Sequence, residues 1–135
     1  MRDIRFRGKR LDTGEWVKGY YSKGPSGTVY ITPYRVGNPI KVDPETVGQW
    51  TGLKDCEGYK IYEGDIVRIT GNYKPGLYIV FWDEHRVAWW GKNVKRDRRD
   101  LQYDDDFYQL LGDCFQMTSR EVVGNIYDDP ELLDS

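Results

Sequence analysis

Residues 59–90 read YKIYEGDIVRITGNYKPGLYIVFWDEHRVAWW, and this segment gives the strongest indication of the fold class. β-Branched and aromatic side chains, which pack well on a pleated and half-buried surface, fill three short runs in it: Ile66–Thr70, Leu77–Trp82 and Val87–Trp90. A loop rich in glycine and proline separates the first two runs, and Asp83, Glu84 and His85 precede the third. Runs of this length between turn residues predict a three-stranded antiparallel meander, which is the usual component of a small SH3-like barrel.

Similar short runs fill the N-terminal third of the chain. They are Ile4–Arg7, Trp16–Tyr21, Thr28–Thr32, Ile40–Val42 and Val47–Thr51. In the first of them, apolar side chains alternate with arginines, which is the period of a strand with one buried face. The sequence contains 15 glycines and 6 prolines, and these residues interrupt nearly every segment before a helix of ordinary length is complete. The N-terminal part is therefore predicted to be β-rich.

The remaining segments complete an all-β prediction with at most one or two short helices. Glu121–Tyr127 reads as the last strand, and Asp128–Glu131 reads as the start of one helical turn with a proline near its beginning. Apolar residues at helical separations also predict a short helix between Asp104 and Leu111. A boundary near residues 51–59 divides the chain into a β-rich subdomain, 1–55, and an SH3-like barrel, 56–135. One continuous domain over 1–135 is the alternative.

Composition narrows the classes of function. The net charge is −2 with 31% charged residues, so the chain as a whole has no strong attraction for nucleic acid or an anionic membrane. Two cysteines without CxxC spacing and one histidine are too few for a structural zinc site, and no other metal or cofactor is expected. We found neither a signal peptide nor an apolar run long enough to span a membrane. A reduced, soluble protein in the bacterial cytoplasm is the expectation.

Three segments together resemble the YopX family of phage and prophage proteins. They are Arg2–Arg10 with the Gly14–Tyr20 turn and strand, Thr51–Gly58 with its continuation Ile61–Val67, and Glu121–Leu133. The order and placement of these segments over nearly the whole chain make the resemblance specific. It implies a mostly β fold with an SH3-like barrel in the C-terminal part, and self-association. It implies no activity. Cys56 is a departure, because the family loop more often reads Asp-Lys-Asn-Gly.

Four carboxylates lie near two glycine turns between residues 55 and 65, and they raise the question of a metal site. They belong to Asp55, Glu57, Glu63 and Asp65. Their spacing does not match the calcium-binding loop pattern of EF-hands. Asp and Glu side chains also bind backbone amides in glycine-containing turns. The interpretation we adopt is therefore that these carboxylates stabilise turns.

The candidate binding segment is an aromatic and basic run, in which arginine and lysine can neutralise phosphates while the aromatic rings stack on bases. Its members are Trp89, Trp90, Lys92, Lys95, Arg96, Arg98 and Arg99. Asp97 and Asp100 dilute the run, and three further aspartates follow at 104–106. A charge run of mixed sign is typical of a solvated surface. Nucleic-acid binding is therefore kept as the alternative function.

The remaining polar residues give little support for catalysis. His85 lies beside two acidic residues in an expected turn, and Cys56 would act as a nucleophile only if a base such as His85 were close to it. The predicted function is therefore that of a phage or prophage accessory protein that is not an enzyme. It acts by binding phage or host protein partners and by forming a homo-oligomer. No catalytic residue is assigned.

Overall fold

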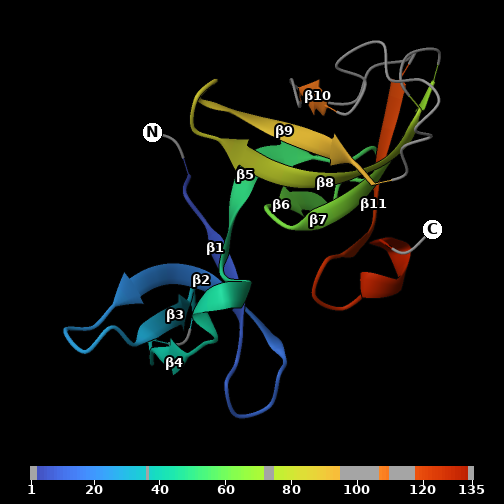
Figure 1. Cartoon of the computed structure of the whole chain (residues 1–135). Helices are drawn as coiled ribbons and strands as arrows, with labels where there is room; N and C mark the ends of the chain where they lie inside the picture. Colours follow the sequence, from blue (N-terminus) through green and yellow to red (C-terminus); the bar gives the residue numbers. More distant parts are fainter. Residues whose placement is uncertain (1–2, 36, 72–74, 95–106, 110–117, 134–135) are drawn as a thin grey trace. The chain divides into compact units, whose positions relative to one another are not determined.

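The computed structural model describes residues 3–35, 37–71, 75–94, 107–109 and 118–133. The chain divides into two compact units, Met1–Gly52 and Leu53–Ser135. Both are built from antiparallel strands (Figure 1). The all-β prediction is confirmed, because the helical elements in the described ranges are two short 3-10 turns. None of these described helices is long and apolar enough to cross a membrane.

The strands of the N-terminal unit are β1 (Phe6–Lys9), β2 (Trp16–Lys23), β3 (Val29–Pro33), β4 (Ile40–Lys41) and β5 (Gly48–Lys54), which continues two residues past the unit boundary. The first four of them form a meander, in which β1 pairs with β2, β2 with β3 and β3 with β4. The strand order of the sheet is β4-β3-β2-β1-β5-β6, where β6 (Lys60–Tyr62) belongs to the C-terminal unit. β1 therefore lies between β2 and β5, and it is a central strand although it has only four residues.

One face of this sheet forms the core of the N-terminal unit. The core contains Val17, Val29, Ile31 and Val42, with Phe6, Ile40 and Val47 packed against it. A 3-10 turn, η1 (Pro44–Thr46), follows β4. Thr46 fixes η1 to β1, because its hydroxyl accepts a hydrogen bond from Lys9 N at 2.9 Å and donates one to Asp43 O at 2.7 Å.

The C-terminal unit contains a five-stranded sheet of order β10-β9-β8-β7-β11. Its strands are β7 (Asp65–Gly71), β8 (Gly76–Asp83), β9 (Ala88–Asn93), β10 (Phe107–Gln109) and β11 (Thr118–Asn125). The predicted meander is confirmed as β7-β8-β9. The buried cluster consists of Ile61, Val67, Ile69, Tyr78, Val80 and Trp89, with Leu53 and Val122 packed against it. The last predicted strand and helical turn are present as β11 and η2 (Pro130–Leu133).

Two details of the sequence prediction are not met. The short helix expected between Asp104 and Leu111 is wrong at Phe107–Gln109, which pair with β9 as a strand. Pairing with a neighbouring strand overrides the helical spacing of the apolar residues there. The SH3-like barrel is not confirmed, because no pairing in the described residues joins the edge strands β10 and β11 and the sheet stays open.

The tight turn between β11 and η2 explains a glycine of the third family-like segment. A Cβ at Gly124 would lie 2.5 Å from Asp129 Oδ2. This oxygen accepts a hydrogen bond from Asn125 N at 3.1 Å, and the Asn125 side-chain oxygen accepts from Tyr127 N and Asp128 N. Only a residue without a side chain leaves room for this set of hydrogen bonds.

The β8–β9 turn contains an unfavourable backbone conformation. Val87 has φ of +51° and is the non-glycine residue with positive φ in the described ranges. A β-branched side chain is a genuine outlier in this region. Its side chain is 71% exposed, so burial in this chain does not offset the strain.

Replacing Val87 with asparagine should therefore stabilise the protein. Asparagine adopts positive φ more readily than valine, and the left-handed conformation costs an ordinary residue about 1–2 kcal/mol. We expect Val87→Asn to raise the free energy of unfolding by about 1 kcal/mol in urea denaturation. Val87→Thr is the control, since it keeps the β-branched side chain and should give no such gain. A decrease in stability for Val87→Asn would show that the turn is not strained.

Candidate functional site

Cations and aromatic rings share the face of the N-terminal sheet opposite its core. Arg7 pairs with Lys18, and Lys9 pairs with Trp16. Because directly opposed residues in antiparallel strands project to the same side and side chains alternate along a strand, these four side chains lie opposite Val17 and the core. The same alternation and the β2–β3–β4 register place further residues on this side. We call the whole set the cation–aromatic face: Arg5, Arg7, Lys9, Trp16, Lys18, Tyr20, Tyr30, Tyr34, Lys41 and Trp50.

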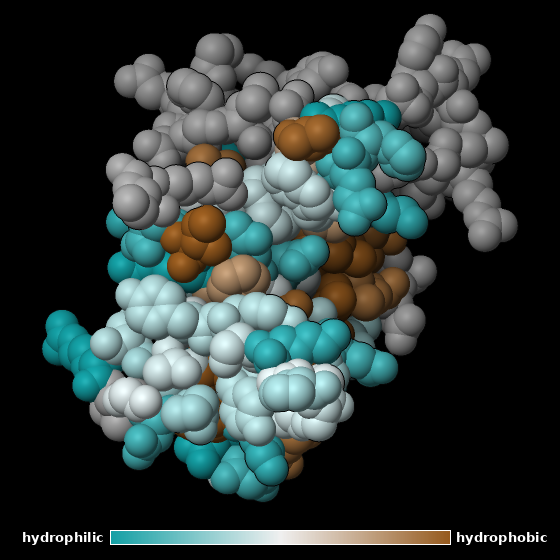
Figure 2. Space-filling view, turned by 90° about the vertical axis from the view of Figure 1, so that its left-hand side faces the viewer, coloured by the Kyte–Doolittle hydropathy of each residue, from teal (hydrophilic) through white to brown (hydrophobic). Residues whose placement is uncertain are grey.

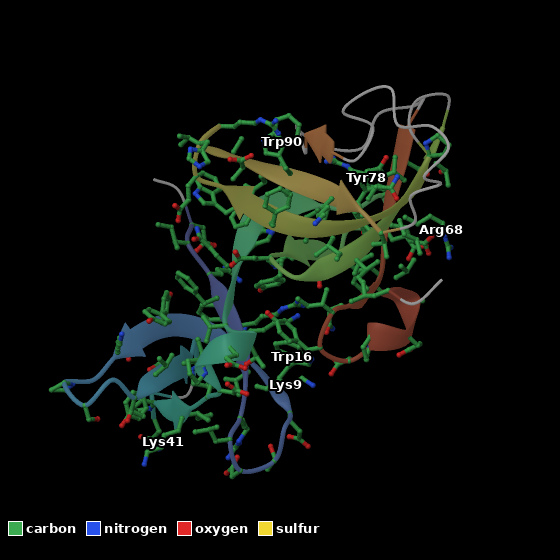
Figure 3. All side chains as sticks on the ribbon, viewed as in Figure 1. Lys9, Trp16, Lys41, Arg68, Tyr78 and Trp90 are labelled. Carbon is green, nitrogen blue, oxygen red and sulfur yellow. The ribbon has the colours of Figure 1, made fainter. Side chains whose placement is uncertain are left out.

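Cation–π contacts order the side chains of β1 on this face. The guanidinium carbon of Arg7 lies 4.6 Å from the centre of the Trp16 ring, and Lys9 Nζ lies 5.4 Å from the same ring. Lys9 and Trp16 are seen next to each other in Figure 3. The cations attract the electron-rich ring faces. Trp16 is therefore in contact with two positive charges from the neighbouring strand.

A second group on the same face is centred on Arg5. Its guanidinium carbon lies 4.7 Å from the Tyr34 ring centre and 5.9 Å from that of Trp50. Tyr34 meets Tyr20 edge to face at 4.9 Å. The strand pairing supports this arrangement, because Trp50 N donates to Arg5 O at 2.8 Å. Residues that are far apart in the sequence thus form one ordered cluster.

The cation–aromatic face is accessible at its periphery. Tyr20 is 56% exposed and Tyr34 36% exposed, and Lys18 and Lys41 are also exposed. Arg7 is buried beneath them. Figure 2 shows side chains of intermediate hydropathy, the range to which tyrosine and tryptophan belong, gathered on one side of the N-terminal unit. Ordered interior charges with accessible rings and lysines around them are suited to binding rather than to acid–base chemistry.

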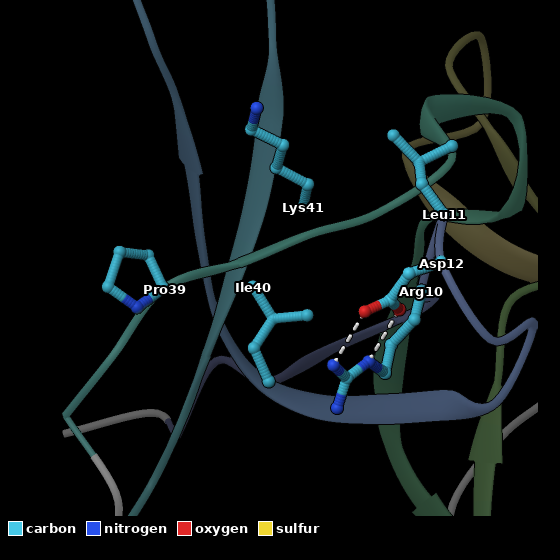
Figure 4. Close-up of a pocket in the computed structure, with 6 residues that line it drawn as sticks. All are labelled: Arg10, Leu11, Asp12, Pro39, Ile40 and Lys41. Atoms are coloured by element: carbon cyan, nitrogen blue, oxygen red, sulfur yellow. Dashed lines mark hydrogen bonds and ion pairs between the residues drawn. The ribbon is translucent and has the colours of Figure 1, made fainter.

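A surface hollow of about 300 Å³ lies on the N-terminal unit between the β1–β2 turn and the chain leading into β4. Figure 4 shows six residues that line it: Arg10, Leu11, Asp12, Pro39, Ile40 and Lys41. The Arg10 guanidinium donates two hydrogen bonds to the Asp12 carboxylate, each of 2.9 Å. These bonds lower the pKa of Asp12 and raise that of Arg10. Arg10 and Asp12 neutralise each other, so Lys41 is the remaining charge among the residues that line this hollow.

The residues of the predicted binding segment do not all share a surface. Trp89 is 9% exposed and belongs to the core, whereas its neighbour Trp90 points to the opposite side of β9 because side chains alternate. The Arg86 guanidinium lies 4.4 Å from the Trp90 ring centre. Lys92 is exposed and lies two residues beyond Trp90. Lys95, Arg96, Arg98 and Arg99 lie outside the described residues, so the segment as a whole stays a prediction.

The turn interpretation of the acidic residues is confirmed for Asp55 and Asp65. Asp55 is 6% exposed; one carboxylate oxygen accepts from Glu57 N at 3.0 Å and Tyr59 N at 2.8 Å, and the other accepts from Val122 N at 3.0 Å. Asp65 accepts from Tyr62 N at 2.7 Å. Within the described ranges, no three His, Cys, Asp or Glu residues are grouped as metal ligands would be.

Cys56 does not offer a free thiol. It is bonded in a disulfide, so the expectation of reduced cysteines is wrong at this position. Its sulfur accepts from Arg120 N at 3.3 Å, and Cys56 N donates to Arg120 O at 3.0 Å. His85 is exposed in the β8–β9 turn, where its backbone N–H binds the Asp83 carboxylate. A disulfide-bonded sulfur cannot act as a nucleophilic thiolate.

Sequence reasoning did not find the cation–aromatic face. Its local signal was the alternation of Arg5 and Arg7 with apolar residues, which marks a strand with one polar face. Trp16, Tyr34 and Trp50 come from three other segments, and only the strand order β3-β2-β1-β5 brings them next to the arginines.

Comparisons with known proteins point to a family and a fold. The family model described as YopX protein matches residues 5–134. No curated protein matches the chain. Among solved structures, the chain is similar to the crystal structure of protein EF1440 from Enterococcus faecalis, with a TM-score of 0.52 and 19% identity. The match covers 99% of this chain and 100% of that one. At this identity, the likeness concerns the fold alone.

Removing the Asp55 carboxylate should destabilise the C-terminal unit. Three backbone amides lose their acceptor in Asp55→Ala, and a buried donor left unsatisfied costs about 1–3 kcal/mol. We expect the free energy of unfolding to fall by about 3 kcal/mol in chemical denaturation. Asp55→Asn should lose less, because one acceptor oxygen remains. Glu57→Ala, an exposed change in the same loop, is the control, and an equal loss for that variant would contradict the role of Asp55.

The Asp12 carboxyl should titrate below the ordinary range of an aspartate, because the hydrogen bonds from Arg10 favour its charged form. Since the folded pKa lies below the unfolded one, the ion pair stabilises the fold above the unfolded pKa. That contribution is lost as the pH falls through the folded pKa. Carbon-detected NMR titration measures the value directly, and Arg10→Gln should move it upward. An unchanged Asp12 pKa in this variant would contradict the assignment.

Proposed function

This chain belongs to the YopX family, and from that premise we propose that it is a phage or prophage accessory protein that acts by binding protein partners, including a second copy of itself. It performs no catalysis and works in the cytoplasm of the bacterial host. The observation that carries the proposal is the end of the β8–β9 hairpin, where an exposed valine is held in a strained conformation near an exposed tryptophan.

Trp82 and Val87 have the properties of interface residues. Trp82 is 36% exposed, and its ring packs edge to face on buried Trp89 with centres 5.1 Å apart. A rigid aromatic side chain that is anchored at its base loses little conformational entropy on binding. Val87, 71% exposed, adds an apolar contact at the cost of backbone strain. Strain of this kind concentrates where a protein binds something.

Self-association is tested by light scattering on the purified full-length chain. We expect a mass above the 15.9 kDa monomer at micromolar concentration. Trp82→Ala and Val87→Asn should shift the mass toward the monomer, although we expect Val87→Asn to be more stable than the natural chain. Tyr59→Ala is the control, because Tyr59 is 65% exposed but lies outside the hairpin.

A monomeric mass for the natural chain at every concentration would reject self-association. Affinity capture from phage-induced cells then tests a different protein partner, with the natural chain compared with Trp82→Ala. Proteins that the natural chain captures and Trp82→Ala does not capture would support the β8–β9 hairpin as the binding surface. Identical captured sets would contradict it.

Nucleic-acid binding by the Trp89–Arg99 segment is the second candidate. The observation in its favour is the stacking of Arg86 on Trp90 beside exposed Lys92, on the side of β9 opposite the core. If this surface binds phosphates, the affinity for an oligonucleotide should fall steeply with salt, and Arg86→Ala with Lys92→Ala should flatten that dependence. An unchanged salt dependence in this double variant would show that the Trp90 side of β9 does not bind the phosphates.

A further inference from the structure

We infer that the cation–aromatic face of the N-terminal unit binds single-stranded nucleic acid. The first observation is the division of charge along the chain. Residues 1–52 contain nine Lys and Arg against five Asp and Glu, a net charge of +4, and residues 53–135 contain 11 against 17, a net charge of −6. A net charge of −2 for the whole chain therefore conceals a basic unit. Charge asymmetry between the parts of a chain is typical of contact with a polyanion.

The basic charge of the N-terminal unit gathers on one face. Five of its nine cations belong to the cation–aromatic face: Arg5, Arg7, Lys9, Lys18 and Lys41. Asp3 contacts this group, through a hydrogen bond of 2.7 Å from Arg5 Nε. Two other acids are engaged elsewhere, because Asp12 pairs with Arg10 and Asp43 caps η1 by accepting from Glu45 N. Cations that are gathered on one face of a sheet attract the phosphates of a nucleic acid.

Accessible rings supply the second requirement, which is a surface on which bases stack. Tyr20 and Tyr34 are in edge-to-face contact and both are exposed. Arg5 lies over Tyr34, so a guanidinium plane continues the surface. Bases stack on aromatic rings and on arginine planes whatever their identity. The Trp50 and Trp16 rings of the same face are themselves in contact with cations, Arg5 and Arg7 respectively.

An unpaired strand fits this face better than a duplex or an acidic protein. Rings reach the flat side of a base only when the base is not stacked within a duplex. An acidic protein segment would be attracted by the lysines, but its carboxylates do not offer the tyrosines the large aromatic surface of a nucleobase. Charge and rings on one sheet face together favour single-stranded DNA or RNA.

The charge part of the inference is tested with the full-length chain and a labelled oligothymidylate by fluorescence anisotropy. Affinity should fall with salt, with a slope of about 0.7 for each phosphate contacted. Lys18→Ala with Lys41→Ala should reduce that slope by about 1.4, because two contacts are lost. Lys23→Ala is the matched control, since Lys23 is an exposed lysine of β2 on the opposite side of the sheet. It should leave the slope unchanged.

The stacking part is tested by a second matched pair. Tyr20→Leu should weaken binding by about tenfold, because a leucine side chain does not stack on a base. Tyr21→Leu removes the neighbouring tyrosine from the opposite side of β2, where it packs on Phe6, and should weaken binding much less. Tryptophan fluorescence should also change on titration, since Trp16 and Trp50 lie within the face.

Several outcomes would overturn the inference. One is that the chain does not bind the oligothymidylate at low salt. Another is that Lys23→Ala reduces the salt slope as much as Lys18→Ala with Lys41→Ala does. Equal affinity for polyglutamate would show that the face attracts any polyanion or an acidic protein. Tighter binding to a duplex oligonucleotide than to the single strand would show that bases do not stack on the tyrosines. Loss of binding in Arg86→Ala with Lys92→Ala, but not in the N-terminal variants, would assign it to the β9 surface. Trp82→Ala should not affect oligonucleotide binding, so this test is independent of self-association.

Discussion

Side-chain oxygens that accept hydrogen bonds from backbone amides hold the strand ends of this protein in place, and the remaining structure depends on them. Asp55 closes its own loop and binds β11 through Val122 N. Asp65 closes the turn before β7, and Asn125 with Asp129 closes the turn after β11. Turn closure fixes where each strand begins, and the starting residue decides which side chains enter the core.

Two of the three segments that resemble the YopX family are explained by folding. Gly124 leaves space for Asp129, and Asp55 and Asp65 bind backbone amides. The first segment differs, because it supplies residues of the cation–aromatic face: Arg5, Arg7, Lys9, Trp16, Lys18 and Tyr20. The β8–β9 hairpin, which is the other surface that we connect with binding, lies outside all three segments. Where the resemblance is carried by turns, it indicates a fold rather than a function.

The sequence predicts the local features well and the long-range ones poorly. The β7-β8-β9 meander follows from alternating apolar runs between turns, and η2 follows from Pro130 after two aspartates. The helix expected over 104–111 is wrong at Phe107–Gln109, because a three-residue strand owes its conformation to pairing with β9. The strand alternation that separates Trp89 from Trp90 was available in the sequence. The meeting of Arg5 with Tyr34 and Trp50 was not, since it requires the strand order.

In this protein, turns carry the fold and strand faces carry the binding. Amide chemical-shift mapping of the full-length chain during titration with oligothymidylate tests this division. We predict shifts at residues of the cation–aromatic face, with Lys18 and Tyr20 prominent, and unchanged amides at Asp55, Asp65 and Asn125. Shifts concentrated at those three turn residues, with the N-terminal face unchanged, would contradict the account.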